Sequence, residues 1–235
     1  MDWTAVQSIR YESEKYGPSN YSIYMNKDYG NVKGYTFSLT KRYDPVSKTS
    51  AFVDYTYQVT EGNSVTSGSF YYTALSGEQE EKRIVPLAWD QRHILNTNVS
   101  VGDPRNWNLG IISKLSSGWP YTPNIPDANY VPQPNSGRKP WQWRVDMRLH
   151  KNFKVGKLNY LVFMKVYNLL DRRNERYVFN DTGRAGYTYV FQSTQETQGF
   201  KNHYGEPGVH EWSEYQVRPH YYTAPRSINV GFSVD

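Results

Sequence analysis

Side chains that bind metals gather in one stretch of the sequence. His203, Glu206, His210, Glu211 and Glu214 place imidazole and carboxylate groups within one short region. Such groups are ligands of divalent metals, but their spacing here matches no zinc motif. A polar loop exposed to solvent explains the same residues better. We therefore predict neither a metal site nor a cofactor.

A second set of charged side chains recurs at every other position. Arg144, Asp146, Arg148 and His150 alternate with large apolar residues. From one face of a strand they would contact a solute or a neighbouring domain, or pair with charges on adjacent strands. The chain has no Ser-centred elbow, phosphate loop or HExxH motif, and no two carboxylates stand apart as a glycosidase pair. We therefore expect binding rather than catalysis, and no enzyme.

A predicted hairpin over residues 141–170 positions these charges. Apolar residues occupy odd positions before a turn at residues 154–157 and even positions after it, so each strand has one apolar and one polar face. Each arm has about 11 to 13 residues, whereas strands of soluble proteins run to about 5 to 6. A tilted strand crosses a bilayer with about 9 to 11 residues. The face predicted to meet lipid carries Trp141, Trp143, Val145, Met147, Leu149, Tyr160, Val162, Met164 and Val166.

The composition narrows the class of protein. The 235 residues are 37% hydrophobic and 16% aromatic, include no cysteine, and carry a formal net charge of +5. Disulfides and thiolate metal sites are therefore excluded. No run of about 18 apolar residues predicts a membrane helix, but a barrel of strands stays open because only alternate residues meet lipid. The basic residues form no nucleic-acid-binding signature, so nucleic acid is not an expected partner.

The predicted connections alternate between short and long. Further alternating segments predict strands at residues 21–26, 31–43, 49–59, 90–102, 107–116 and 226–235, with a loop at residues 17–20. Short turns fall at residues 44–48, 103–106 and 154–157, and long loops at residues 60–89, 118–140 and 171–225. An up-and-down barrel of about eight strands would place all short turns at one rim, as outer-membrane barrels do. A soluble sandwich gives no reason for this sorting.

The polar faces of these strands suit a water-filled interior. Asparagine, serine and glycine recur opposite the apolar positions of several strands. Such faces are too polar for a dry core. The residues predicted to face the lumen are Asn96, Asn98, Arg144, Asp146, Arg148, His150 and Lys165.

Several segments together resemble the C-terminal part of a TonB-dependent outer-membrane receptor. They occupy residues 31–39, 89–93, 117–123, 135–138 and 166–171, followed by a final alternating strand. In this order they cover about residues 25–235. The resemblance implies that residues 1–235 are one barrel segment of a 22-stranded transporter. It also implies an N-terminal plug that has no match in this sequence.

The resemblance implies a function as well. A siderophore, vitamin, glycan or peptide would be taken up across the outer membrane of a Gram-negative-type bacterium. The expected partners are the lipid bilayer, the remaining barrel strands and plug, and the TonB complex through the absent N-terminal region. Such barrels usually end on an aromatic residue, whereas this chain ends on Asp235, and Met1 is followed by no secretion signal. We therefore expect a fragment of a longer chain.

Two other interpretations fit the same alternation. The first is a passive pore or a small, self-contained outer-membrane barrel. The second is a soluble β-rich ligand-binding domain, which would bury the apolar face in a core. Aromatic residues in the long loops would either grip a ligand or pack the loops, and the sequence does not separate these roles.

Overall fold

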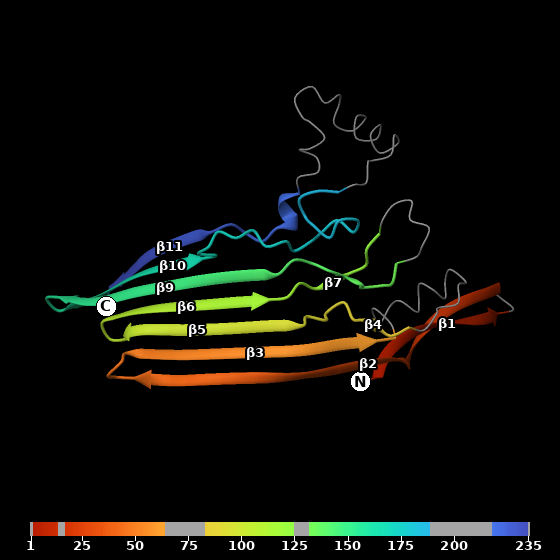
Figure 1. Ribbon diagram of the computed structural model, residues 1–235, viewed down its shortest axis with the longest axis horizontal. Helices are drawn as coiled ribbons and strands as arrows, with labels where there is room; N and C mark the ends of the chain where they lie inside the picture. Colours follow the sequence, from red (N-terminus) through yellow and green to blue (C-terminus); the bar gives the residue numbers. More distant parts are fainter. Residues whose placement is uncertain (1, 14–16, 64–82, 125–131, 189–217, 235) are drawn as a thin grey trace, which may run out of the picture.

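The computed structural model describes residues 2–13, 17–63, 83–124, 132–188 and 218–234, and these form an all-β structure. Eight strands follow one another in a single antiparallel sheet (Figure 1). They are β1 (Asp2–Ser13), β2 (Gly17–Asp44), β3 (Thr49–Gly62), β5 (His93–Asp103), β6 (Trp107–Ser116), β9 (Gln142–Val155), β10 (Leu158–Tyr167) and β11 (Ser227–Val234).

Short elements decorate one end of this sheet. β4 (Val85–Pro86) pairs with the end of β3, and β7 (Pro120–Tyr121) pairs with β8 (Gly137–Arg138) as a separate ribbon. A single 3-10 turn, η1, spans Pro219–Tyr221. These elements lie within the connections that the sequence predicts to be long, so the described parts of those connections are structured.

The predicted strands from residue 31 onward are confirmed, with shifts at their ends. The predicted loop at residues 17–20 is wrong, because β2 begins at Gly17 and pairs with β1 from Ser13 onward. Turn-forming residues suggest a loop locally, but residues 10–13 of β1 lie opposite residues 17–20 as strand partners. The weak strand expected at residues 21–26 belongs to the same long β2.

The predicted sorting of connections is also confirmed. The β2–β3, β5–β6 and β9–β10 turns lie at one end of the sheet, and the described parts of the long connections lie at the opposite end (Figure 1). The β2–β3 turn is closed by the Asp44 carboxylate, which accepts hydrogen bonds from the backbone of Val46 at 3.0 Å and Ser47 at 3.1 Å. Gly156 supplies a φ of 62° in the β9–β10 turn, a conformation that glycine adopts at little cost.

The register gives the sheet two continuous faces. Met147 of β9 lies opposite Ile111 of β6 and Val166 of β10. The next residue, Arg148, lies opposite Gly110 and Lys165 on the other face. The same parity holds across β2, β3, β5 and β11. Seven strands therefore share one mainly apolar face and one mainly polar face.

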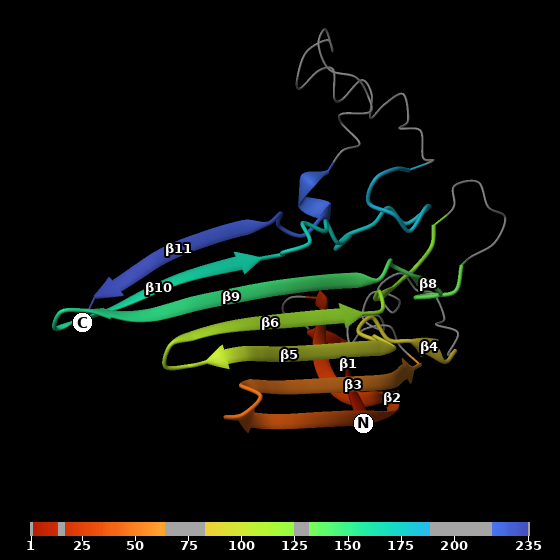
Figure 2. The ribbon, with the colours of Figure 1, turned by 60° about the vertical axis from the view of Figure 1, so that its left-hand side comes forward.

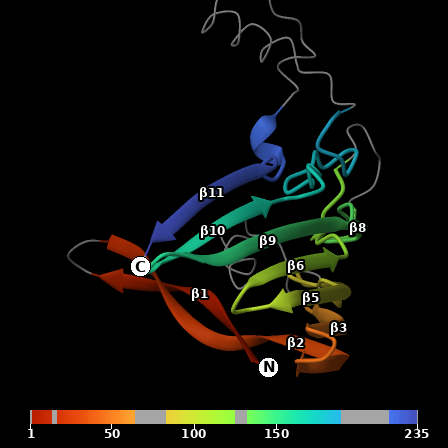
Figure 3. The ribbon, with the colours of Figure 1, turned by 90° about the vertical axis from the view of Figure 1, so that its left-hand side faces the viewer.

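The described residues put no second layer over either face of this sheet (Figure 3). On the apolar face Phe37 is 61% exposed, Val230 70% and Phe232 77%. A sheet with an apolar face is normally covered by another layer. The buried hydrophobic residues are few: Val85, Leu87, Val145, Val166, Val178 and Ala185.

Successive hairpins are staggered in one direction. β5 continues past Val101, the partner of Thr49, to Asp103. β9 likewise continues past Lys151, the partner of Trp107, to Val155. Figure 2 shows the β9–β10 turn projecting beyond the β5–β6 turn. Stagger of this kind is what a sheet needs to curl toward closure.

Candidate functional site

The polar face brings together the charged residues that the sequence places in the lumen. Adjacent strands set Asp54 beside Asn96, Asn96 beside Lys114, and Lys114 beside Arg144. Arg148 of β9 lies directly opposite Lys165 of β10, so two cations meet in one row. All seven predicted lumen residues share this face: Asn96, Asn98, Arg144, Asp146, Arg148, His150 and Lys165.

Asp146 is engaged by its own strand and by the exit of the next one. Its carboxylate accepts hydrogen bonds from Arg144 Nε at 2.9 Å and from the backbone N–H of Asn168 at 2.8 Å. The ion pair thus lies along β9, where the sequence suggested pairs with neighbouring strands. Asp146 therefore fixes the end of β10 and leaves Arg148 and Lys165 as the adjoining cations of this face.

Asn168 holds both ends of the last long connection. Its side-chain amide donates to Arg172 O at 3.1 Å and to Ala224 O at 3.0 Å. Its own φ is 54°, a left-handed conformation that asparagine tolerates better than most residues. The sequence marks this asparagine only as part of a motif, and a positive-φ turn directly after a strand is the signal that would have identified its role.

A buried carboxylate joins three segments at the long-loop end. Asp90 is 0% exposed and accepts hydrogen bonds from Thr60 N at 2.8 Å and Arg92 Nε at 3.0 Å. Arg138, far along the chain, donates to the same carboxylate through Nη2. Two of the three donors are arginines, and their positive charges offset the cost of burying this carboxylate. Two of the segments that carry the resemblance, those around residues 90 and 138, therefore meet at this carboxylate.

Further hydrogen bonds hold these segments in register. Ser117 Oγ accepts from His93 N at 3.0 Å, and Ser117 O accepts from Gln91 Nε2 at 2.9 Å. Asn135 Nδ2 donates to Pro86 O at 2.7 Å, and Asn135 N donates to Thr122 Oγ1 at 3.0 Å. This cluster positions the loop ends and carries no exposed catalytic group.

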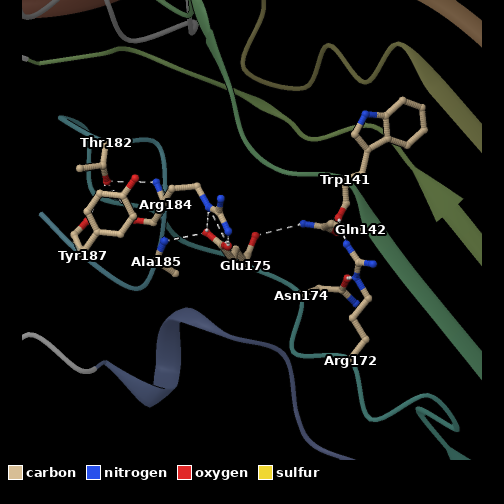
Figure 4. Close-up of polar contacts among 9 residues, drawn as sticks. All are labelled: Trp141, Gln142, Arg172, Asn174, Glu175, Thr182, Arg184, Ala185 and Tyr187. Carbon is tan, nitrogen blue, oxygen red and sulfur yellow. Dashed lines mark hydrogen bonds and ion pairs between the residues drawn. The ribbon is translucent and has the colours of Figure 1, made fainter.

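Asn174 extends the sheet beyond the end of β10 (Figure 4). Its side-chain oxygen accepts from Trp143 N at 2.9 Å, and its side-chain nitrogen donates to Trp143 O at 2.9 Å. The Asn174 side-chain amide thereby pairs with the Trp143 backbone as the peptide group of a neighbouring strand would. Arg172 adds a hydrogen bond from Nη2 to Trp141 O at 3.2 Å.

Glu175 lies beside Asn174, and its backbone oxygen accepts a hydrogen bond from Gln142 Nε2 at 3.5 Å while its carboxylate binds its own loop (Figure 4). Arg184 binds the carboxylate through Nη2 at 2.7 Å and Nε at 3.0 Å, and Ala185 N donates to it at 2.6 Å. The hydrogen bond with Glu175 raises the pKa of Arg184 above its usual value. Asp90 and Glu175, both at the long-loop end, therefore bind neighbouring segments of the chain.

The apolar face is lined with aromatic rings toward both ends. At the long-loop end, Tyr35 and Tyr57 lie 5.4 Å apart between ring centroids, Tyr57 and His93 5.1 Å, and His93 and Trp141 5.5 Å. At the short-turn end, Phe153 and Tyr160 stack at 5.4 Å with an interplanar angle of 9°. The rows between them are mainly aliphatic, with Thr97 and Ser113 as polar members. The nine residues predicted to meet lipid all share this face, but two of them, Val145 and Val166, are buried.

Some predicted positions lie outside the described residues. These are the possible metal ligands His203, Glu206, His210, Glu211 and Glu214. Within the described ranges, no three histidine or acidic side chains gather as a metal site. No helix in the same ranges is long and apolar enough to cross a membrane.

Comparison with known proteins adds no relative to this picture. No protein-family model, curated protein or solved structure matches the chain. The antiparallel all-β sheet, its two faces and its loop-end cluster are therefore the basis for assigning a function.

Proposed function

We propose that the chain is the C-terminal section of the barrel of a TonB-dependent outer-membrane receptor that takes up a scarce nutrient. The observation that carries the proposal is the mainly apolar face, most of whose large side chains are exposed although Val145 and Val166 are buried. In water such a face would be costly at about 25 cal/mol for each Å² left exposed. A lipid bilayer removes that cost without a second protein layer.

The dimensions of the apolar face support a membrane span. Trp143 and Phe153 lie on the same face of β9, separated by about 33 Å at about 3.3 Å per residue. With a tilt of about 40°, that length covers about 25 Å of height, which is the apolar band of outer-membrane barrels. The aromatic rings flank this band at both ends, as aromatic girdles do.

The ends of the sheet support a barrel larger than this section. β1 and β11 are the terminal strands of the sheet and do not pair with each other. In lipid every backbone hydrogen-bonding group needs a partner, so a spanning sheet has to close. The strand stagger is compatible with closure through further strands, and active uptake with a plug follows from the resemblance of the loop-end motifs.

Lipid exposure of the apolar face is tested by spin labelling. This chain contains no cysteine. Once any cysteine in the rest of the protein is replaced by serine, Leu149→Cys and Val162→Cys label the apolar face, with Arg148→Cys and Asn96→Cys as matched positions on the polar face. The full-length protein in phospholipid vesicles is exposed to oxygen, which concentrates in the bilayer, and to a water-soluble nickel chelate. We expect apolar-face labels to collide mainly with oxygen and polar-face labels to meet more chelate. Apolar-face labels shielded from both reagents would mean a soluble protein with a dry core.

A passive pore or a small, self-contained barrel is the second candidate, and the eight consecutive strands favour it. Eight strands suffice for the narrowest outer-membrane barrels. Planar-bilayer recordings of the full-length protein separate the two functions. A plugged receptor passes no steady current, whereas an open pore gives a stable single-channel conductance.

A further inference from the structure

The last long connection builds a cluster of rings and cations at the long-loop end. Arg176 N and Tyr177 N both donate to Tyr221 O, at 2.7 and 3.1 Å. This double hydrogen bond joins the two described parts of the connection. The adjoining bridge between Glu175 and Tyr222 fixes the same pair of segments. The cluster therefore has a defined backbone rather than depending on side chains alone.

Three cations of this cluster lie over aromatic rings. The Arg218 guanidinium is 5.2 Å from the centroid of Phe179 and 5.3 Å from that of Tyr221. Arg176 and Lys139 lie 5.5 and 5.9 Å from the centroid of Tyr177. The Tyr177 and Tyr221 rings are themselves 5.8 Å apart. Three positive charges thus surround two neighbouring rings.

Within the described part of the chain, none of these three cations forms an ion pair. The nearby carboxylate of Glu175 is taken by Arg184. Burial lowers the pKa of Lys139, so holding its charge here is costly. A guanidinium stacked on a ring keeps in-plane N–H donors, the geometry that carboxylates and phosphates bind. A bound anion would offset the repulsion among the three cations.

The polar face continues the positive charge away from this cluster. Two carboxylates on this face, Asp54 and Asp146, are outnumbered by four cations, namely Lys114, Arg144, Arg148 and Lys165. Asp54 accepts a hydrogen bond from Ser38 at 2.6 Å, and Asp146 binds Arg144. A face with an excess of one charge raises the local concentration of ions of the opposite sign.

A pocket at the short-turn end repeats this chemistry. It has a volume of about 540 Å³, and its lining consists of Arg105, Asn106, Asn152, Phe153, Lys154, Asn159, Tyr160 and Leu161. No described residue forms an ion pair with Arg105 or Lys154. Cationic side chains therefore occur at both ends of the sheet as well as along its polar face.

We propose that the cluster formed by Lys139, Arg176, Tyr177, Arg218 and Tyr221 is an anion-binding subsite, and that the transported solute carries carboxylate or phosphate groups. The cation–ring geometry and the lack of a described counter-ion carry the inference. It rests on the proposed function, because it assigns a substrate class to the same barrel. The cluster captures the anion, and the cations of the polar face favour its passage.

Calorimetric titration of the full-length protein in detergent tests the subsite. The probes are citrate for carboxylate, pyrophosphate for phosphate, and trimethyl citrate as the uncharged analogue. We expect binding of at least one anion, weakened by added salt, and no binding of the ester. The stronger of citrate and pyrophosphate identifies which group the site prefers.

Charge-neutralising variants locate the binding. Arg176→Gln and Arg218→Gln each weaken binding about tenfold, the loss expected for one charge-assisted hydrogen bond. Arg218→Lys keeps the charge but not the planar fork and gives a smaller loss. Arg173→Gln, an exposed arginine outside the cluster, is the matched control and changes affinity less than about twofold.

Two outcomes would overturn the subsite. One is equal binding of citrate and trimethyl citrate, or no binding of either anion. The other is a loss in Arg176→Gln and Arg218→Gln no greater than in Arg173→Gln while all variants keep the wild-type unfolding midpoint. Either result leaves the spin-label test of the barrel untouched. Conversely, apolar-face labels shielded from both reagents would reject the barrel even where the anions bind.

Discussion

The sheet and the long-loop end of this molecule distribute their side chains in opposite ways. On the sheet, large apolar residues lie in the open, with Phe232 77% exposed. At the long-loop end polar residues are buried, with Asp90 0%, Asn168 5% and Asn174 6% exposed, beside a few small or aliphatic ones such as Leu87 and Ala185. Water-soluble proteins normally reverse this arrangement. The loop end is therefore held largely by hydrogen bonds, whereas most of the apolar face of the sheet has no cover among the described residues.

The strongest test of the loop end is the removal of its buried charge. Asp90→Asn leaves Arg92 and Arg138 facing a neutral group and is expected to lower the free energy of unfolding by about 3 kcal/mol. Asp54→Asn is the control, because Asp54 lies on the polar face and only partly buried beside Ser38. Urea unfolding in phospholipid vesicles measures both. Equal losses at the two positions would mean that burial does not increase the contribution of Asp90 to the free energy of unfolding.

The sheet is tested by one substitution at two neighbouring residues. Ile111 lies on the apolar face opposite Met147, and Ile112 lies on the polar face opposite Asp146. In vesicles, Ile111→Arg is expected to lower the free energy of unfolding by about 2 to 4 kcal/mol, the cost of an arginine facing mid-bilayer lipid. Ile112→Arg faces water and Asp146, so its effect stays within about 0.5 kcal/mol. Similar losses for both variants would contradict a lipid-facing side.

The sequence predicted the sheet far better than the loop end, for a physical reason. Alternation along a strand is a local pattern, so the faces of residues 141–170 can be read before any partner is known. The Asp90–Arg138 contact joins residues 48 positions apart and leaves no periodic trace. The same holds for the amide of Asn174, which pairs with a tryptophan 31 positions away. Each of these segments is recognisable as a motif by itself, but no local pattern shows that the segments meet.

At the N-terminal strands the sequence predicts a loop where the structure has a strand. Gly17 and Pro18 suggested a loop, yet both lie in β2 and pair with β1. Turn propensity is a weak local preference that a strand partner overrides. A turn signal can be recognised in the local sequence, whereas pairing with another strand cannot.

The junction between the two regions is tested at Asn174. Asn174→Ala removes both hydrogen bonds to the Trp143 backbone and leaves its N–H and C=O unpaired. We expect a loss of about 2 kcal/mol in the free energy of unfolding. Hydrogen exchange at Trp143 N should quicken in this variant. Asn180→Ala, at an exposed asparagine of the same connection, is the control and should leave both measurements near wild type.

The smallest expected effect separates the charge of Lys139 from its packing. Burial lowers the pKa of this lysine in the folded state, so the unfolded chain binds more protons just below the ordinary lysine pKa. Stability then rises with pH through that interval, because the folded state has lost its proton while the unfolded state still holds it. Lys139→Met keeps the aliphatic stem and removes this contribution. The free energy of unfolding is measured between about pH 8 and pH 10, below the ordinary lysine pKa. It should rise less steeply with pH in the variant than in the wild type. Parallel slopes would show that the loop end tolerates this cation without cost and would weaken the argument for a bound anion there.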